Sequence, residues 1–299
     1  MEVLRLAGNF WCNSLSELTS VLVSQVPAMR ARVRTLAVRA PSHDCSVMSE
    51  NIQTVRAGAV LTIRMARPEK KNALTVAMYT AMDDAMHSAM ADDAVRVILI
   101  TGTDGVFTSG NDLREFASAP ASLEDSAVIR FLGTISTCPK PVVAAVSGLA
   151  IGIGTTMLLH CDLVVADPGT RFSLPFINLG LVPEGGSSLL LPRMLGHLRA
   201  SELLLLGDMF DAAAAEKYGI VNRVSAPGAA DVEAMQWAEQ LAAKAPSAMR
   251  LSKALLRSET TGLQARMLEE ARQFGAQLQG PEFREAVAAF MAKRPPSFG

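Results

Sequence analysis

Apolar and polar residues alternate along residues 59–65, a pattern that predicts a β-strand. Residues 75–90 instead repeat methionines every fourth position, at Met78, Met82 and Met86. That spacing predicts a helix with a methionine stripe packed in a core. Further short apolar runs predict buried strands at residues 95–101, 141–146 and 163–166. Short strands alternating with helices indicate an α/β fold.

The last part of the chain has a helical pattern and no strand pattern. Its predicted helices cover residues 231–244, 248–257, 263–278 and 282–293. Such helices could pack as a separate layer or mediate oligomerisation. The predicted organisation is therefore an N-terminal extension (1–47), a core that holds the active site (48–245) and a C-terminal helical region (246–299).

Residues 1–47 hold five arginines but only three acids. A secretory signal fits poorly, because Glu17 and several serines interrupt any apolar centre. We expect this extension to be poorly ordered, and either an arginine-rich transit segment or a product of an upstream start codon, with Met48 as the natural start. The expected location is cytoplasmic, or the mitochondrial matrix if the extension is a transit segment.

The composition narrows the class of protein. The 299 residues are 49% apolar and 19% charged, with a net charge of −1. This favours a globular protein with a large core and argues against nucleic acid as a partner. No apolar run reaches the length of about 18 residues that a membrane-spanning helix needs. The four cysteines are scattered, so no metal site is expected, and His160 beside Cys161 is interpreted as packing.

Three loops carry candidate chemistry. Residues 107–113 follow a predicted strand and contain Gly110, where backbone can approach a ligand. Residues 147–156 form a glycine-rich strand-to-helix junction, which can point free N–H groups at an anion. Residues 181–188 place Glu184 between apolar segments, where it could serve only as a charge at a helix start.

Together these loops resemble the crotonase (enoyl-CoA hydratase/isomerase) superfamily. The resemblance is carried by residues 67–74 (RPEKKNAL), 109–113 (SGNDL) and the glycine segment 147–154, and it runs from about residue 51 to the C-terminus. Residues 109–113 and 183–188 (PEGGSS) are most similar to peroxisomal-type Δ3,Δ2-enoyl-CoA isomerases. The implied fold is a crotonase-like ββα spiral core with a C-terminal helical oligomerisation region.

The resemblance also implies catalytic roles. The backbone N–H groups of Asn111 and Ile153 would form an oxyanion hole for the thioester oxygen. The two glutamates that hydratases use to handle water fall at Thr156 and Phe176, where neither side chain can act as a carboxylate base. Glu184 matches the isomerases' catalytic glutamate and would be a single proton-shuttling base with a raised pKa.

The substrate implied by the resemblance is an enoyl-CoA thioester, with coenzyme A as part of the substrate and no separate cofactor or metal. Phe290 and Lys293 match a family aromatic and lysine that reach CoA, often from a neighbouring subunit of a homotrimer or dimer of trimers. Hydration or other acyl-CoA chemistry, and a non-catalytic acyl-CoA-binding role, stay open as alternatives. The other expected substrate-binding residues are Ala73, Ser109, Gly110, Asp112, Leu113, Gly152, Gly154 and Phe176.

Overall fold

The computed structural model describes residues 45–116, 123–258 and 262–298, and of residues 45–49 the backbone alone. The predictions for residues 1–44 lie outside the described residues. The expected boundary at residue 47 falls within the first described strand, β1 (Cys45–Ser49). This strand pairs antiparallel with β2 (Ile52–Ala57).

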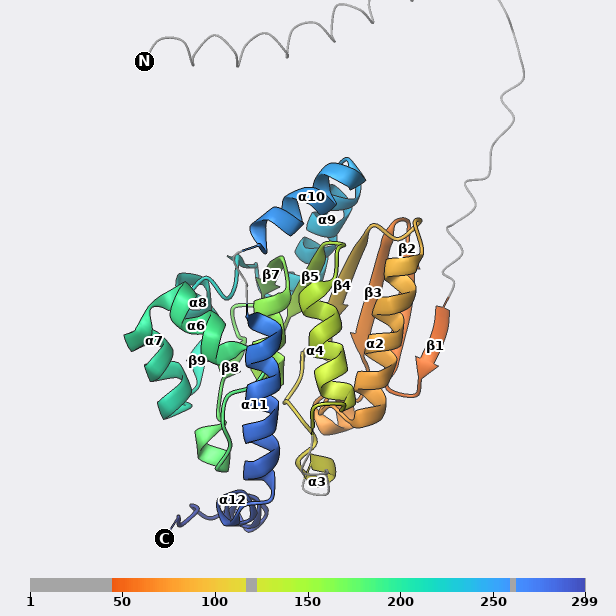
Figure 1. The fold of residues 1–299 in the computed structure, drawn as a ribbon. Coiled ribbons are helices and arrows are strands. Elements are labelled where there is room, and N and C mark those ends of the chain that lie inside the picture. Colours follow the sequence, from red (N-terminus) through yellow and green to blue (C-terminus); the bar gives the residue numbers. More distant parts are fainter. Residues whose placement is uncertain (1–44, 117–122, 259–261, 299) are drawn as a thin grey trace, which may run out of the picture. The chain divides into compact units, whose positions relative to one another are not determined.

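In the described part of the chain, seven strands form the larger sheet, in the order β1-β2-β3-β4-β5-β7-β10 (Figure 1). Within this sheet, β3, β4, β5, β7 and β10 run parallel to one another, which agrees with the predicted α/β fold. A second sheet holds β6, β8 and β9. The bounds are β3 (Val60–Met65), β4 (Val97–Thr101), β5 (Val142–Val146), β6 (Leu149–Ile151), β7 (Leu163–Ala166), β8 (Arg171–Ser173), β9 (Phe210–Asp211) and β10 (Arg223–Val224).

Side chains alternate between the two faces of the larger sheet, because successive residues of a strand point in opposite directions. In β4, Val97 and Leu99 pack with alanines of α9 (Ala230–Ala242). Ile98 and Ile100 belong instead to the main hydrophobic cluster, which includes α2 (Val76–Ala91) and α4 (Ala127–Thr137). Figure 1 shows α2 and α4 side by side on that second face.

Helix α2 follows the predicted pattern closely. Thr75 accepts a hydrogen bond from the Met78 N–H and begins the helix, and Met78, Met82 and Met86 are all buried. The remaining elements before the C-terminal region are short. They are η1 (Pro68–Lys70), α3 (Leu113–Phe116), α5 (Ile153–Thr156), η2 (Met157–His160), η3 (Ile177–Leu179), α6 (Ser187–Leu195), α7 (His197–Ser201), the π-helical turn η4 (Glu202–Leu206) and α8 (Ala212–Lys217).

The C-terminal region is helical, as predicted, with α10 (Pro246–Leu256), α11 (Leu263–Leu278) and α12 (Pro281–Met291). Helix α11 lies against the core beside α4 (Figure 1). Its buried side chains Met267 and Phe274 belong to the main hydrophobic cluster. This region is thus continuous with the core. No helix among the described residues has the length and apolar character needed to span a membrane.

Candidate active site

A cavity of about 740 Å³ opens where the loops after β4 and β6 meet the C-terminal helices. Cavities of this size bind small organic ligands. Most of the residues predicted to bind substrate line it. They are Ala73, Ser109, Gly110, Asn111, Asp112, Leu113, Gly152, Ile153, Phe176 and Phe290.

The loop after β4 runs beside β6. The Thr108 N–H donates to the Leu149 carbonyl (2.8 Å), and the Ile151 N–H donates to the Thr108 carbonyl (3.2 Å). A Cβ on Gly154 would lie 2.6 Å from the Thr108 γ-methyl, so glycine is what lets the loops pack this closely. Gly154 therefore supports the cavity from behind and does not line it.

This pairing leaves two backbone donors at the cavity. Among the described residues, no acceptor bonds the N–H of Asn111 or that of Ile153. Ile153 begins α5, directly after Gly152, whose φ of 56° turns the chain into the cavity. Two unpaired N–H groups of this kind can stabilise an oxygen that gains negative charge. The arrangement fits the predicted oxyanion hole.

Asp112 has a structural task in the same loop. Its carboxylate forms an ion pair with Arg67 at 2.8 Å and accepts a hydrogen bond from the Arg114 N–H at the start of α3. The Arg67 bond holds the pKa of Asp112 below its usual range. Buried Asn72 adds a second tie, because its Nδ2 donates to the Val106 carbonyl at 2.6 Å. Residues 67–74 therefore hold the Asn111 loop in place.

Glu184 is buried, and its Oε1 accepts a hydrogen bond of 2.5 Å from the Thr156 hydroxyl. Burial raises the pKa of Glu184 to about 8, and the negative charge of Glu270 adds to the rise, while the Thr156 hydrogen bond opposes it. Glu184 precedes α6. Among the described residues, the N–H groups of Gly186 and Ser188 at the start of α6 donate to Glu270 of α11, which caps the helix. The hydrogen bonds that cap α6 are therefore made by Glu270 and not by Glu184.

Glu184 faces a void of about 20 Å³ beside the main cavity. Asn111, Phe116 and Phe274 line both spaces. The Phe274 ring meets Phe116 and Phe176 edge to face, with both centroid distances 6.4 Å. Glu184 thus adjoins the cavity at an aromatic cluster to which Phe176 belongs, which agrees with a dry pocket at that position.

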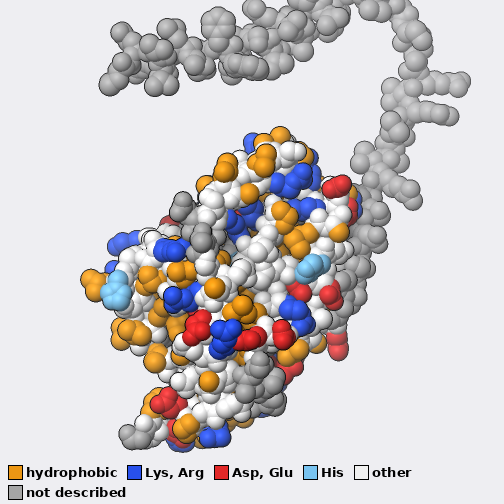
Figure 2. Space-filling model, viewed as in Figure 1, with side chains coloured by type: hydrophobic (Ala, Val, Ile, Leu, Met, Phe, Trp, Pro, Cys, Tyr) orange, Lys and Arg blue, Asp and Glu red, His pale blue; other side chains and the backbone are white. Residues whose placement is uncertain are grey.

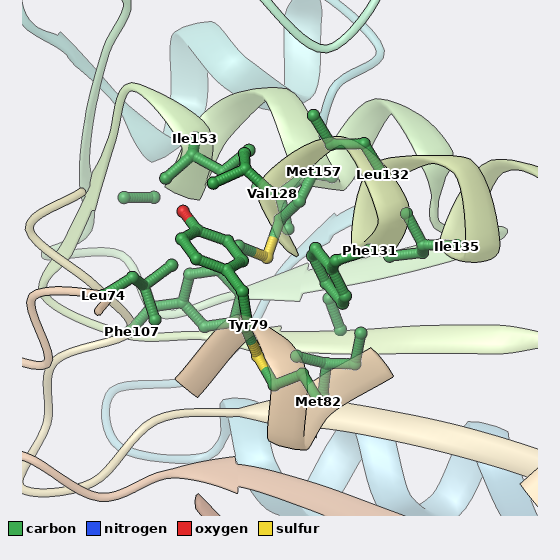
Figure 3. Close-up of a cluster of buried hydrophobic side chains, with 14 of the residues drawn as sticks. Leu74, Tyr79, Met82, Phe107, Val128, Phe131, Leu132, Ile135, Ile153 and Met157 are labelled. Atoms are coloured by element: carbon green, nitrogen blue, oxygen red, sulfur yellow. The ribbon is translucent and has the colours of Figure 1, made fainter. Parts of the chain in front are cut away.

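Tyr79 is a site residue that the sequence did not reveal, because its position in α2 fits the core pattern. Its ring lies inside the cluster of Figure 3, with the hydroxyl oxygen on the side of Ile153. The hydroxyl donates to Asn111 Oδ1 at 2.5 Å. Burial and the charge of Glu184 raise the pKa of Tyr79 well above its usual value, so the hydroxyl stays protonated. The hydrogen bond fixes the Asn111 side chain.

Some predicted contacts lie elsewhere. Lys293 is exposed after α12 and does not line the cavity, whereas Phe290 lines it from the same chain. Lys70 also lines the cavity. Glu270 and Phe274 could not be identified from the sequence, because both follow an ordinary amphipathic pattern in α11.

His160 is the last residue of η2 and is buried, as interpreted. Its ring bonds the Gly185 carbonyl through Nε2 at 2.7 Å, and burial lowers the pKa of His160 to about 4. The described residues contain no group of three or more His, Cys, Asp or Glu side chains arranged to hold a metal ion.

Comparison with known proteins connects this geometry to a family. The family model for enoyl-CoA hydratase/isomerase matches residues 56–299. The chain belongs to the enoyl-CoA hydratase/isomerase family. Membership in this family, part of the crotonase superfamily, confirms the predicted resemblance and the crotonase fold, and it makes the protein an acyl-CoA enzyme of the hydratase/isomerase kind.

Relatives in the enoyl-CoA hydratase/isomerase family carry different names. A probable enoyl-CoA hydratase of Rhizobium meliloti is 36% identical over 81% of this chain and 95% of its own. Rat enoyl-CoA delta isomerase 2 is 35% identical over 83% of this chain, which spans 65% of the rat protein. The solved structure of Pseudomonas aeruginosa OdaA is 48% identical, with a TM-score of 0.79 over 81% of this chain and 99% of that one.

Proposed function

We propose that the protein is a Δ3,Δ2-enoyl-CoA isomerase, which moves the double bond of a 3-enoyl-CoA to the 2-position. The observation that carries the proposal is the buried carboxylate of Glu184, which accepts a hydrogen bond from Thr156 and adjoins the cavity that Asn111 and Ile153 line. Coenzyme A belongs to the substrate, and the proposed pathway is the β-oxidation of unsaturated fatty acids.

The proposed reaction needs one base and one oxyanion site. Glu184 removes a proton from C2, the C2–H electrons form a C1–C2 double bond, and the C1–O π electrons move onto the thioester oxygen to give a dienolate that keeps its C3–C4 double bond. The N–H groups of Asn111 and Ile153 stabilise that oxygen. Glu184 then returns the proton at C4, so that no atom is gained or lost. When C4 is protonated, the C3–C4 π electrons form the new C4–H bond, the C1–C2 double bond shifts to C2–C3, and the thioester carbonyl re-forms. A base with a pKa of about 8 suits both taking and returning a proton near neutral pH.

The residues around Glu184 favour isomerisation over hydration. In the family pattern, hydratases carry their two water-handling glutamates at the positions of Thr156 and Phe176. Here Thr156 is a hydrogen-bond donor to the base, and Phe176 is a buried aromatic that lines the cavity. A lone carboxylate beside an apolar wall supports proton transfer better than the activation of a water nucleophile.

The test is a panel of 2-enoyl- and 3-enoyl-CoA esters with the wild-type protein and Glu184→Gln. We expect wild type to convert 3-enoyl-CoA to the 2-enoyl product, and the Gln variant to lose about 10²–10⁴ in kcat. Binding of the saturated acyl-CoA should persist in both proteins, because the oxyanion donors are backbone groups. No turnover of any 3-enoyl-CoA by wild type would refute the proposal, and tight binding without turnover would instead support an acyl-CoA-binding role.

Hydration is the second candidate, because most of the similar proteins are named hydratases. In that case Glu184 would orient a water molecule for attack on a 2-enoyl-CoA. Turnover of crotonyl-CoA to the hydroxyacyl product, at a rate that exceeds the conversion of 3-enoyl-CoA, would favour hydration over isomerisation.

We also propose that the chain forms a homotrimer or a dimer of trimers. Large apolar side chains are exposed on the surface formed by α6, α7 and η4, where Figure 2 shows hydrophobic side chains gathered. Contiguous apolar surface of this kind is typical of protein interfaces. Light scattering on the purified protein tests the assembly, and a monomer mass at micromolar concentration would refute it. The exposed residues include Met194, Leu198, Leu205 and Leu206.

A further inference from the structure

Helix α11 carries a buried carboxylate, Glu270, that the proposed reaction does not use. Only 6% of the residue is exposed, and a buried carboxylate needs hydrogen-bond donors to offset its lost hydration. Its donors come from the segment just after Glu184. They are the Gly186 N–H at 2.6 Å, the Ser188 N–H at 3.0 Å and the Ser188 hydroxyl at 2.5 Å. The loop that holds Glu184 is therefore bonded to α11.

The shape of this loop leaves it little room to move. Gly185 and Gly186 both have left-handed backbone, with φ of 68° and 73°. A Cβ on Gly186 would lie 2.4 Å from Leu263 Cδ1 of α11, and one on Gly185 would lie 3.1 Å from the Thr156 side chain. The two glycines therefore lie between α5 and α11, and Glu270 bonds the Ser188 N–H that follows them.

We propose that Glu270 is a positioning residue, which holds the Glu184 loop through the N–H groups of Gly186 and Ser188 and so lets a C-terminal helix set the place of the base. The inference rests on the proposed function, because it assigns Glu270 to the same site. Glu270 acts through Glu184 and touches no substrate. Its role is to keep the carboxylate within reach of both carbon atoms, where small displacements cost large factors in rate.

Glu270 also sets the electrostatic surroundings of Glu184. The other titratable groups that face this loop are Tyr79 of α2 and His160 of η2, with Arg266 beside Glu270 at 3.4 Å from the Ser188 hydroxyl. Burial keeps Tyr79 and His160 uncharged near neutral pH. Burial raises the pKa of Glu270, its three donors oppose that rise, and its charge raises the pKa of Glu184.

The experiment compares Glu270→Gln with Glu269→Gln. Glu269 is the adjacent, exposed acid of α11 and pairs with Arg272, so its variant makes the same chemical change away from the loop. We expect Glu270→Gln to lower kcat for a 3-enoyl-CoA about tenfold or more, with KM within about twofold, because the base is misplaced and the cavity is intact. We expect Glu269→Gln to match wild type.

Two further readouts separate positioning from general damage. Loss of the Glu270 charge should move the acid limb of the kcat/KM profile to lower pH, since the proton of Glu184 is then held less tightly. Amide hydrogen exchange should accelerate at Gly186 and Ser188 while the strands of the core keep their protection. An unchanged kcat, an unmoved pH limb or unchanged exchange at these two amides would each overturn the inference.

Ser188→Ala and Glu270→Asp test the same role of Glu270 in two further ways. If Glu270→Gln fails to fold, Ser188→Ala decides, because it removes one donor and should still lower kcat several-fold and speed exchange at Gly186. Glu270→Asp keeps the charge but shortens the reach, so kcat should fall while the pH limb stays in place. If wild type fails to convert any 3-enoyl-CoA, the proposed function falls, and exchange at Gly186 and Ser188 still decides whether Glu270 holds the loop.

Discussion

The two loops that carry Asn111 and Ile153, called here the oxyanion loops, differ from the Glu184 loop in how their backbone N–H groups are bonded. The loops around Asn111 and Ile153 are tied to each other by hydrogen bonds but leave two N–H groups unbonded at the cavity. The Glu184 loop uses its N–H groups at Gly186 and Ser188 to bind Glu270, and offers the reaction a single carboxylate. In the proposed reaction, one region therefore acts through its main chain and the other through one side chain.

This difference predicts which substitutions each region tolerates. A main-chain donor survives the loss of its own side chain, but it fails when the backbone moves. A side-chain base fails when its carboxylate is removed or its pKa changes, even where the backbone stays in place. The four predictions that follow test this contrast, from the largest expected effect to the smallest.

Gly110→Ala should damage the oxyanion hole most. Gly110 has a φ of 93°, and an added Cβ would lie 2.8 Å from the Ile151 carbonyl oxygen, so the Asn111 N–H must shift. Loss of one such donor costs about 10²–10³ in kcat. Gly105→Ala is the matched control, since its φ is 69° but nothing lies within 4 Å of its Cβ position. A Gly110→Ala rate within threefold of wild type would contradict the assignment.

The rate should depend on pH through Glu184. The base must be deprotonated to take the proton, and its pKa is about 8, so kcat/KM should rise about tenfold per pH unit up to pH 8 and then level off. Between pH 6 and pH 8 the rise should be about fiftyfold, because the deprotonated fraction grows from about 1% to about 50%. The measurement is a pH series with a 3-enoyl-CoA. A flat profile over this range would show that another group is the base.

Thr156→Val should move the acid limb of the kcat/KM profile to higher pH. The Thr156 hydroxyl stabilises the charged form of Glu184, so its removal raises the pKa of Glu184 further. We expect the acid limb to move to higher pH and the rate at pH 7 to fall about tenfold, in line with the loss of one hydrogen bond to a charged group. Thr156→Ser keeps the hydroxyl and should behave like wild type. A limb that moves to lower pH in the Val variant would reverse the assigned role.

Asn111→Ala should have the smallest effect. The backbone N–H remains, and the variant loses only the contact with the Tyr79 hydroxyl, so kcat should fall about threefold or less. Tyr79→Phe removes the same hydrogen bond from the other side and should give a similar result. A hundredfold loss in Asn111→Ala with an unchanged Tyr79→Phe would show that the Asn111 amide takes part in the reaction directly.

The sequence alone predicted those strands and helices that are long enough to show a clear hydrophobic periodicity. The strands near residues 59–65, 95–101, 141–146 and 163–166 and the helices of the C-terminal region all exist. The strands of the second sheet were not predicted, because β8 and β9 have only three and two residues and too little periodicity. Their pairing depends on tertiary contacts that no local pattern encodes.

Site residues, like secondary-structure elements, could be predicted only where the local sequence has an unusual pattern. Glu184 could be singled out because it is an acid between apolar segments, and the oxyanion loops because their glycines mark unusual backbone. Glu270 could not, since an acid every few residues is ordinary for a helix surface, and only the fold places this one beneath α6. Gly154 was expected to line the cavity, yet it packs against Thr108, because its need for glycine comes from the neighbouring loop.

The position of α11 in the chain has a consequence for biosynthesis. The ribosome makes the oxyanion loops and Glu184 well before it makes residues 263–278, which supply the cap of α6 and the Phe274 wall. A nascent or truncated chain that ends before α11 has every group of the proposed reaction but lacks the side chains that hold the Glu184 loop and pack beside it. Premature termination late in the message should thus yield a chain that contains the catalytic residues and lacks a finished site.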